Sequence, residues 1–298
     1  MDITGFALVT GAGSGIGRDT GMAYAIEGAA GVIFADVDEL AAKATADESY
    51  KVAKNPCYQG YSIKVDVSDE ASVMAMVAFA VEKFGRIDYC VNSAGVIFSI
   101  LADAYISERH HIVGVEEPEE VANASLAEFE RFWNVNVKGT LLCLKAESLA
   151  MKKQDAITIP SRSGGRDIGR GVIINLGSCN SYMATPKIVQ YTSSKHAVLG
   201  MTKNAALDNA QYGIRVNAIC PSWVDTPMVS KAVQGDPSLG ELMKTVIPMG
   251  RIAQQEEFSE VQLRDRGWMD CGWRYNVAAA EIALRCQMAQ HHEKPGFH

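Results

Sequence analysis

Short apolar runs alternate with longer amphipathic stretches through the first 220 residues of the chain. The apolar runs have the length of buried strands, and the stretches between them have the length of helices. The predicted strands are 6–10, 32–36, 61–65, 87–91, 171–176 and 214–219. The predicted helices are 15–28, 38–50, 69–84, 125–150 and 188–212. Strands separated by helices predict an α/β fold, a Rossmann-like doubly wound parallel sheet with helices on both faces.

Two segments interrupt this alternation. Residues 97–125 mix aromatic, acidic and histidine residues around Pro118, and residues 152–171 are rich in Gly, Ser and Arg. Because a strand-like pattern resumes directly after each segment, neither is expected to link two domains. We therefore expect one domain, residues 1–258, that carries two long surface loops.

Composition excludes several classes of function. The chain of 298 residues is 48% hydrophobic and 21% charged, with a formal net charge of -7. Neutralising phosphates requires clustered Lys and Arg, so nucleic acid is not an expected partner. No window approaches the run of about 18 apolar residues that a membrane helix needs. The apolar run at 6–10 is also too short for a signal peptide, so we expect a cytoplasmic protein with no membrane partner.

The cysteines and histidines predict neither disulfides nor a metal site. The seven cysteines are odd in number and never spaced C-x-x-C. A disulfide framework or a zinc site would need closer pairs, so we expect reduced thiols. The pairs His110–His111 and His291–His292 lie in polar segments, where solvated side chains are a more ordinary outcome than metal ligands.

A glycine-rich segment follows the first predicted strand. In "TGAGSGIG", Gly11, Gly15 and Gly17 fall on the turn into the next predicted helix. Glycines at such a turn let backbone N–H groups approach a pyrophosphate at the helix N-terminus. A plain strand-to-helix turn is the alternative, but the strand before it and the helix after it favour a dinucleotide site.

Asp36 ends the second predicted strand, about twenty residues beyond Gly17, where a dinucleotide fold places a carboxylate on the adenosine ribose. NADP carries a 2′-phosphate of roughly -1.5 to -2 charges. Unit like charges about 4 Å apart repel by ~4 kcal/mol at an effective dielectric near 20. No arginine stands beside Asp36 in the sequence to offset that repulsion. NAD is therefore favoured and NADP is the alternative; a helix cap is the other role open to Asp36.

The segment 174–200 carries the candidate chemistry. Tyr191 and Lys195 lie four residues apart at a predicted helix start, so their side chains share one face. Lowering a tyrosine pKa of about 10 by three units needs roughly 4 kcal/mol of phenolate stabilisation. A neighbouring ammonium and a cationic nicotinamide could supply it. Ser178, at the end of a predicted strand, can hydrogen-bond to a substrate oxygen.

Together these segments resemble the short-chain dehydrogenase/reductase family of the single-domain type, from about residue 4 to residue 257. The motifs stand in the family's order: TGAGSGIG (10–17), DV (66–67), NSAG (92–95), NVNVKG (134–139), the serine–tyrosine–lysine set, and NAICPSWVDTPM (217–228).

The resemblance implies hydride transfer between a secondary alcohol or ketone and a nicotinamide. Tyr191 would act as general acid or base, and Ser178 would orient the carbonyl. Lys195 would bind the ribose and depress the tyrosine pKa, while Asn136 would place a water behind it. The residues that the resemblance assigns to the cofactor are Gly11, Ser14, Gly15, Ile16, Gly17, Asp36, Asp66, Val67, Asn92, Ala94, Gly95, Tyr191, Lys195, Val224 and Thr226. It also implies a homo-oligomer, either a dimer or a tetramer.

Departures from the family pattern concern the substrate side. Ser222 stands where the family commonly has Gly, and 97–125 is longer than the family needs. That segment is either a flap bearing Phe98 and Tyr105 or a surface excursion. The segment 228–251, which closes over the substrate in this family, has no obvious anchor for a charged group. Its apolar residues are Met228, Val229, Val233, Leu239, Leu242 and Met243. A largely apolar alcohol or ketone, polycyclic or terpenoid-like, is expected, with oxidation favoured by NAD.

The C-terminal tail, residues 259–298, does not resemble the family. Relatives follow 249–261 with a last helix and then a final strand with a glycine-rich ending. The codons for 259–276, read one base downstream, permit such an ending, so we expect a shifted reading frame here. This leaves the final strand in question. It also keeps open an alternative function, a catalytically impaired or dinucleotide-sensing protein on the same fold.

Overall fold

The structure is a computed structural model, and it describes residues 3–97, 120–161, 164–235, 237–247 and 249–264. Strands and helices follow in the predicted order. The strands are β1 (Phe6–Thr10), β2 (Gly31–Asp36), β3 (Gln59–Lys64), β4 (Tyr89–Asn92), β5 (Ile157–Ser161), β6 (Gly164–Gly169), β7 (Gly171–Leu176) and β8 (Ile214–Ile219). The helices are α1 (Gly15–Ile26), α2 (Glu39–Ser49), α3 (Glu70–Phe84), α4 (Leu126–Phe132), α5 (Thr140–Met151), α6 (Val189–Ala210), α7 (Pro227–Gly235), α8 (Pro237–Val246) and α9 (Gln255–Arg264). Short helical turns are η1 (Val121–Asn123), η2 (Trp133–Gly139) and η3 (Cys179–Ser181).

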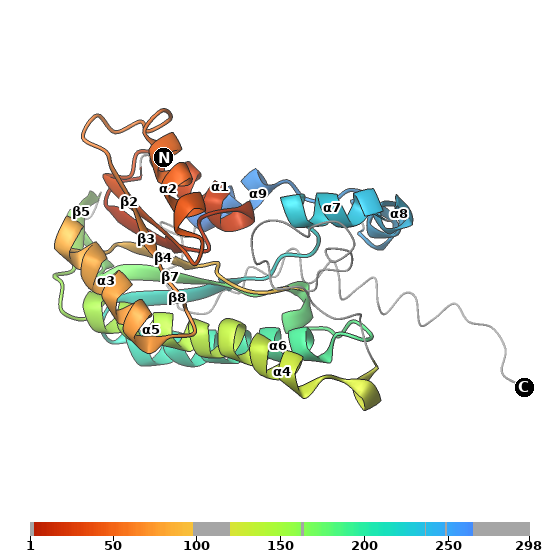
Figure 1. The fold of residues 1–298 in the computed structure, drawn as a ribbon. Coiled ribbons are helices and arrows are strands. Elements are labelled where there is room, and N and C mark those ends of the chain that lie inside the picture. Colours follow the sequence, from red (N-terminus) through yellow and green to blue (C-terminus); the bar gives the residue numbers. More distant parts are fainter. Residues whose placement is uncertain (1–2, 98–119, 162–163, 236, 248, 265–298) are drawn as a thin grey trace, which may run out of the picture.

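The main sheet has six strands in the order β3-β2-β1-β4-β7-β8, and every pairing is parallel. Helices α1, α2 and α9 lie on one face and α3, α5 and α6 on the other (Figure 1). This confirms the predicted doubly wound α/β fold. The chain reverses its direction of winding between β1 and β4, and such a switch point opens a crevice at the carboxyl ends of the strands.

The core has two layers because successive strand residues point to opposite faces of the sheet. Leu8 and Ile33 belong to the apolar cluster shared with α3 and α5. Their sequence neighbours Val9 and Phe34 belong to the cluster under α1 and α9. All four side chains are fully buried, so both faces of β1 and β2 lie in the core, as expected of central parallel strands.

The predicted helix 125–150 is divided into three parts. Between α4 and α5, the segment η2 (Trp133–Gly139) winds as a π-helix. A hydrophobic pattern does not distinguish a π-helical segment from the α-helices on either side, so the sequence predicted a single helix. Such segments are frequent at functional sites, and this one carries Asn136.

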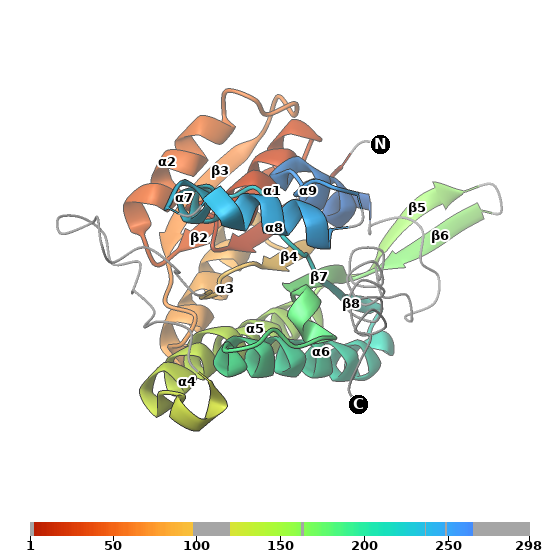
Figure 2. The same cartoon turned by 90° about the vertical axis from the view of Figure 1, so that its right-hand side faces the viewer.

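The predicted surface loop 152–171 contains an antiparallel hairpin formed by β5 and β6. Figure 2 shows this hairpin projecting from the body of the domain. Gly164 and Gly169, at the two ends of β6, have positive φ angles of 110° and 90°. The loop prediction was wrong here because β6 (GGRDIG) has a single apolar side chain, and only its pairing with β5 marks it as a strand.

Helix α9 packs against α1 and closes the described part of the chain. Thr20 on α1 donates its hydroxyl to Gln262 Oε1 at 2.7 Å, and Phe258 is buried in the same layer. Residues 265–298 lie outside the described residues, and so does the question of a final strand there. Phe98 and Tyr105 lie outside them too. Within the described ranges, no helix is long and apolar enough to cross a membrane.

Candidate active site

The glycine turn between β1 and α1 lies at the switch point and exposes backbone atoms that no side chain covers. Gly11 and Gly15 have φ angles of +68° and +54°, which side chains rarely adopt. A Cβ on Gly17 would collide with the carbonyl oxygen of residue 11, so this close approach requires glycine at position 17. Ser14 precedes α1 in extended conformation without capping it, and Ile16 packs against the core below. The turn therefore leaves backbone N–H groups at the start of α1 available to an anion.

Asp36 faces this turn from the end of β2. Its Oδ2 accepts the Gly13 N–H at 2.8 Å, and its Oδ1 accepts the Asp38 N–H at 3.0 Å. The cap of α2 is Asp38, whose side chain accepts two N–H groups of that helix. Asp36 is thus not the helix cap, and its carboxylate borders the glycine turn. Arg18, near the start of α1, forms an ion pair with Glu48 at 2.6 Å and not with Asp36.

Three loops meet around the crevice. A Cβ on Gly11 would lie 2.8 Å from the Ala94 nitrogen, which donates to Thr10 Oγ1 at 3.2 Å. A Cβ on Gly15 would lie 3.8 Å from Thr226 Cγ2. The glycine turn therefore contacts both the NSAG segment after β4 and the segment after β8, as the sequence motifs predict.

The remaining cofactor candidates, Asp66, Val67 and Val224, follow strands at the carboxyl end of the sheet. Asp66 follows β3 and accepts the Ser68 N–H at 2.9 Å and its hydroxyl at 2.7 Å. Val67 is buried, and a Cβ on Gly139 would lie 2.8 Å from a methyl carbon of Val67. Val224 is buried and forms an isolated parallel bridge to the segment before α9.

Asn92 directs its side chain into the protein. Its Nδ2 donates to Glu147 Oε2 and to Asn175 Oδ1, each at 3.0 Å. Asn175 in turn donates to Thr202 Oγ1 at 2.9 Å. This buried network joins β4, α5, β7 and α6. A cofactor contact by Asn92 would therefore involve its backbone.

Glu147 was not predicted from the sequence, where its helix reads as ordinary. It is fully buried, and burial raises the pKa of its carboxyl to about 7, against the hydrogen bonds from Asn92 and Cys90. Asn92 of the NSAG motif therefore donates to a carboxyl group that is partly protonated near neutral pH.

Asn136 lies in the π-helical segment and is held on several sides. Its Oδ1 accepts the Val96 N–H at 2.8 Å, and its Nδ2 donates to Val96 O at 3.0 Å and Ser194 Oγ at 3.1 Å. A Cβ on Gly95 would lie 3.1 Å from Asn136 Oδ1 and 3.9 Å from Lys195 Nζ. The fold thus brings Asn136, Gly95 and Lys195 to one place, while the water expected behind Lys195 stays a prediction.

Ser178, Tyr191 and Lys195 meet at the end of β7. All three are less than a tenth exposed. The Tyr191 hydroxyl is hydrogen-bonded to Ser178. Lys195 Nζ lies 5.7 Å from the Tyr191 ring centre and donates to Leu176 O at 2.8 Å. The three side chains predicted to perform the chemistry form one buried cluster.

Burial controls the ionisation of this cluster. It raises the pKa of Tyr191 above its usual value, although the hydrogen bond from Ser178 acts in the opposite direction. It lowers the pKa of Lys195 to about 8. Protein groups alone therefore do not produce the depressed tyrosine pKa expected from the sequence, because desolvation disfavours both charged forms.

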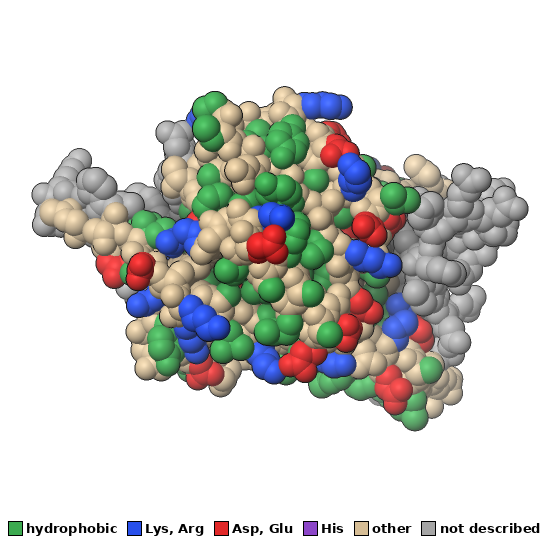
Figure 3. Space-filling view, turned by 60° about the vertical axis from the view of Figure 1, so that its left-hand side comes forward, with side chains coloured by type: hydrophobic (Ala, Val, Ile, Leu, Met, Phe, Trp, Pro, Cys, Tyr) green, Lys and Arg blue, Asp and Glu red, His purple; other side chains and the backbone are tan. Residues whose placement is uncertain are grey.

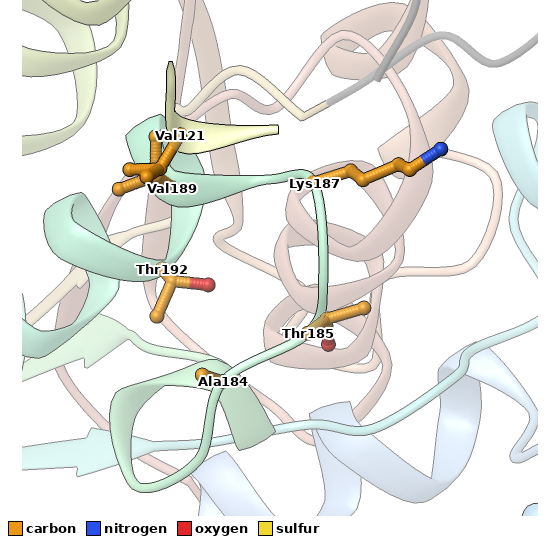
Figure 4. A pocket seen from close by; sticks show the side chains of 6 residues that line it. All are labelled: Val121, Ala184, Thr185, Lys187, Val189 and Thr192. Carbon is orange, nitrogen blue, oxygen red and sulfur yellow. The ribbon is translucent and has the colours of Figure 1, made fainter. Parts of the chain in front are cut away.

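A pocket opens where α6 begins (Figure 4). It is lined by Val121, Ala184, Thr185, Lys187, Val189 and Thr192. Val121 and Val189 both line it, and the Lys187 side chain extends away from the other labelled side chains. Lys187 has a φ of 67° and is the one non-glycine residue of the described part with a positive φ. Residues held in this region are strained and cluster at functional sites.

Two other features bear on possible ligands. Met243 of α8, in the segment predicted to cover the substrate, is fully buried, whereas the side chains of Met228, Leu239 and Leu242 lie outside what the structure describes. On the face shown in Figure 3, acidic and basic side chains are interspersed. This face carries no extended basic patch of the kind that binds nucleic acid.

Sequence reasoning missed Ser181 and Cys179, which help to hold the site. Ser181 Oγ donates to Lys195 O at 2.8 Å and accepts the Ser178 N–H at 3.2 Å. Cys179 contacts Ser178 Oγ at 3.8 Å. The only available signal was the run of small polar residues after β7, which also suits an ordinary turn.

Comparison with known proteins identifies the family. The model of the short chain dehydrogenase family matches residues 5–237. The short-chain dehydrogenase anuF of Penicillium roqueforti is 51% identical over 263 residues, 88% of this chain and 89% of that protein. The 2,5-dichloro-2,5-cyclohexadiene-1,4-diol dehydrogenase of Sphingobium indicum is 31% identical over 95% of this chain and 94% of its own.

Solved structures agree with these matches. Levodione reductase superposes with a TM-score of 0.71 at 30% identity, over 87% of this chain and 88% of that one. The 3-ketoacyl-(acyl-carrier-protein) reductase of Brucella melitensis, in complex with NADH, gives 0.68 at 27% identity, over 88% and 91%. The chain belongs to the short-chain dehydrogenase/reductase family, whose members are oxidoreductases that act on CH–OH groups with a nicotinamide nucleotide.

Proposed function

We propose that this protein oxidises a secondary alcohol to a ketone with NAD, with Tyr191 as the general base. The observation that carries the proposal is the buried cluster of Ser178, Tyr191 and Lys195, in which the tyrosine hydroxyl is hydrogen-bonded to the serine. These groups lie beside the glycine turn, since Gly95 contacts Asn136 next to Lys195 and Ala94 contacts Gly11.

In the proposed reaction, Tyr191 accepts the hydroxyl proton of the alcohol. Ser178 donates a hydrogen bond to the same oxygen, and this bond strengthens as negative charge develops there. A bound nicotinamide would supply the carbon that takes the hydride. With a pKa of about 8, Lys195 is mostly charged at neutral pH. Its ammonium together with a bound cationic nicotinamide would favour the phenolate form of Tyr191 that the reaction needs.

The described residues fit a dinucleotide. Gly11, Gly15 and Gly17 have no side chains to block the backbone N–H groups at the start of α1, which suits a pyrophosphate. Asp36 at the end of β2 is placed to accept hydrogen bonds from ribose hydroxyls. Asn136 would place a water behind Lys195, and Val224 and Thr226 would contact the nicotinamide end. The same cradle would accept NADP only against the charge of Asp36.

Replacing Asp36 by Ala is expected to raise kcat/KM for NADP relative to that for NAD by roughly tenfold or more, because relief of only about 1.4 kcal/mol of repulsion is a factor of ten. Initial rates with each nucleotide give the ratio. Asp38→Ala is the matched control, since it removes a neighbouring carboxylate that caps α2 and should leave the ratio unchanged. An unaltered ratio in Asp36→Ala would show that this carboxylate does not select the cofactor.

The substrate is proposed to be largely apolar and ring-bearing, polycyclic or terpenoid-like, as in secondary metabolism. The pocket at the start of α6 includes Val121 and Val189 among its lining residues. One relative is named as a dehydrogenase of a cyclohexadienediol, and several others are fungal short-chain dehydrogenases. We further propose one domain over 1–258, a cytoplasmic location and a homo-oligomer, dimer or tetramer, with 259–298 as a tail from a shifted reading frame.

The reaction is tested with the purified full chain, NAD and a panel of cyclic secondary alcohols and diols. NADH formation with an apolar cyclic alcohol is expected, with weak or no turnover of charged analogues. NADH binding without turnover of any alcohol would contradict the proposal and favour a dinucleotide-sensing protein.

A further inference from the structure

The thiol of Cys179 lies between Ser178 and Ser222. Its Sγ is 3.8 Å from Ser178 Oγ, within hydrogen-bonding distance for sulfur. The same thiol is hydrogen-bonded to the Ser222 side chain. Ser178 follows β7 and Ser222 follows β8, so one side chain connects the loop of the candidate catalytic serine with the loop expected at the nicotinamide.

Backbone contacts hold this bridge in place. The Cys179 N–H donates to Pro221 O at 2.8 Å, directly before Ser222 in the chain, and the Gly177 N–H donates to Ile219 O at 2.8 Å. The two loops are therefore fixed on both sides of the thiol. Burial raises the pKa of the Cys179 thiol, so the group is neutral and keeps its one proton. Either atom of the contact with Ser178 Oγ can be the donor.

The hydrogen-bonding capacity of Ser178 gives the bridge a direction. A serine hydroxyl has one proton to donate and two lone pairs that accept. One lone pair of Ser178 Oγ accepts the Asn180 N–H at 3.2 Å. When the Cys179 S–H fills the second, the Ser178 proton can only be donated outward, toward Tyr191 and the substrate oxygen. The sulfur then accepts the Ser222 hydroxyl proton.

We propose that Ser222, Cys179 and Ser178 form a directed hydrogen-bond chain in which Cys179 is a positioning residue that aims the Ser178 proton at the substrate oxygen. Each donor in such a chain polarises the next. The inference deepens the proposed function and rests on it, because the role of Ser178 toward the substrate is part of that function.

Kinetics give the first test. Cys179→Ala is expected to lower kcat roughly three- to tenfold, the effect of one lost hydrogen bond that strengthens in the transition state, with little change in KM for NAD. Cys179→Ser keeps a donor and an acceptor and should recover most of the rate. Ser222→Gly should lower kcat by a smaller factor, and by none when Cys179 is already Ala. Cys57→Ala, at an exposed thiol, is the control and should match the wild type.

The infrared S–H stretching band gives a test that needs no substrate. The band of Cys179 is assigned by subtracting the spectrum of Cys179→Ala. It is expected to move to higher frequency in Ser178→Ala, because the thiol loses its acceptor. A shift in a protein that turns over no alcohol would support the chain while counting against the proposed reaction. An unmoved band, or a Cys179→Ala enzyme with wild-type kcat, would overturn the inference.

Discussion

Tyr191→Phe is expected to lower kcat for alcohol oxidation by about 10²- to 10⁴-fold, the range by which a positioned acid or base accelerates a reaction. The substitution removes only the phenolic oxygen. The ring itself packs edge-on against Phe132, with 6.3 Å between ring centres, so the phenylalanine variant should fold normally. Affinity for NADH should change far less than kcat, because Tyr191 is only one of the many residues assigned to the cofactor. Pre-steady-state rates and NADH binding measured on the same preparations separate the two effects.

Tyr212→Phe is the matched control for this experiment. Tyr212 lies two residues beyond the C-terminal end of α6, where the Lys152 ammonium is 4.3 Å from its ring centre. Removing the Tyr212 hydroxyl in this variant should leave kcat unchanged. Equal rates for wild type and Tyr191→Phe would remove the catalytic assignment, whatever the control shows.

Glu147→Gln is expected to stabilise the protein at alkaline pH. Glu147 has a pKa of about 7 in the fold against an ordinary value of 4.5. Charging it in the core therefore costs on the order of 3 kcal/mol. Its Oε1 and Asn92 Oδ1 are both buried acceptors without a partner among the described atoms. Glutamine offers a donor there, carries no charge, and retains an oxygen for the Asn92 amide.

The sign of the pH effect follows from the raised pKa. The stabilisation from neutral Glu147 is complete below pH 4.5 and is lost as pH rises to about 7. Glu147→Gln should lack this loss, so its advantage in free energy of unfolding should grow from about pH 5 to about pH 8. Denaturant unfolding at several pH values measures it. Glu82→Gln, on the exposed face of α3, is the control, and a difference independent of pH would contradict the buried-charge explanation.

The fold was largely predictable because the apolar pattern of a parallel sheet is explicit. β1, β7 and β8 begin and end at the predicted residues. The pattern failed where hydrogen bonding, not burial, decides the structure. The π-helical winding around Asn136 and the hairpin of β5 and β6 are both of that kind.

The candidate site was predictable in its members but not in its electrostatics. Spacing and order brought Tyr191 and Lys195 to one helix face and Ser178 to a strand end. Whether the tyrosine pKa falls depends on how deeply both groups are buried, which a linear sequence does not contain. The partners of Asn92 were also hidden, since Glu147 and Asn175 are distant in sequence and meet only through the sheet.

Transfer of deuterium from substrate to cofactor tests the central claim most directly. An apolar cyclic secondary alcohol that carries deuterium on its carbinol carbon is incubated with the full chain and NAD. Mass spectrometry of the recovered cofactor is predicted to show reduced nicotinamide with one deuterium, formed in step with the ketone and almost absent with Tyr191→Phe. Ketone formation with an unlabelled reduced cofactor, or no transfer from any alcohol to a nucleotide that binds, would contradict the account.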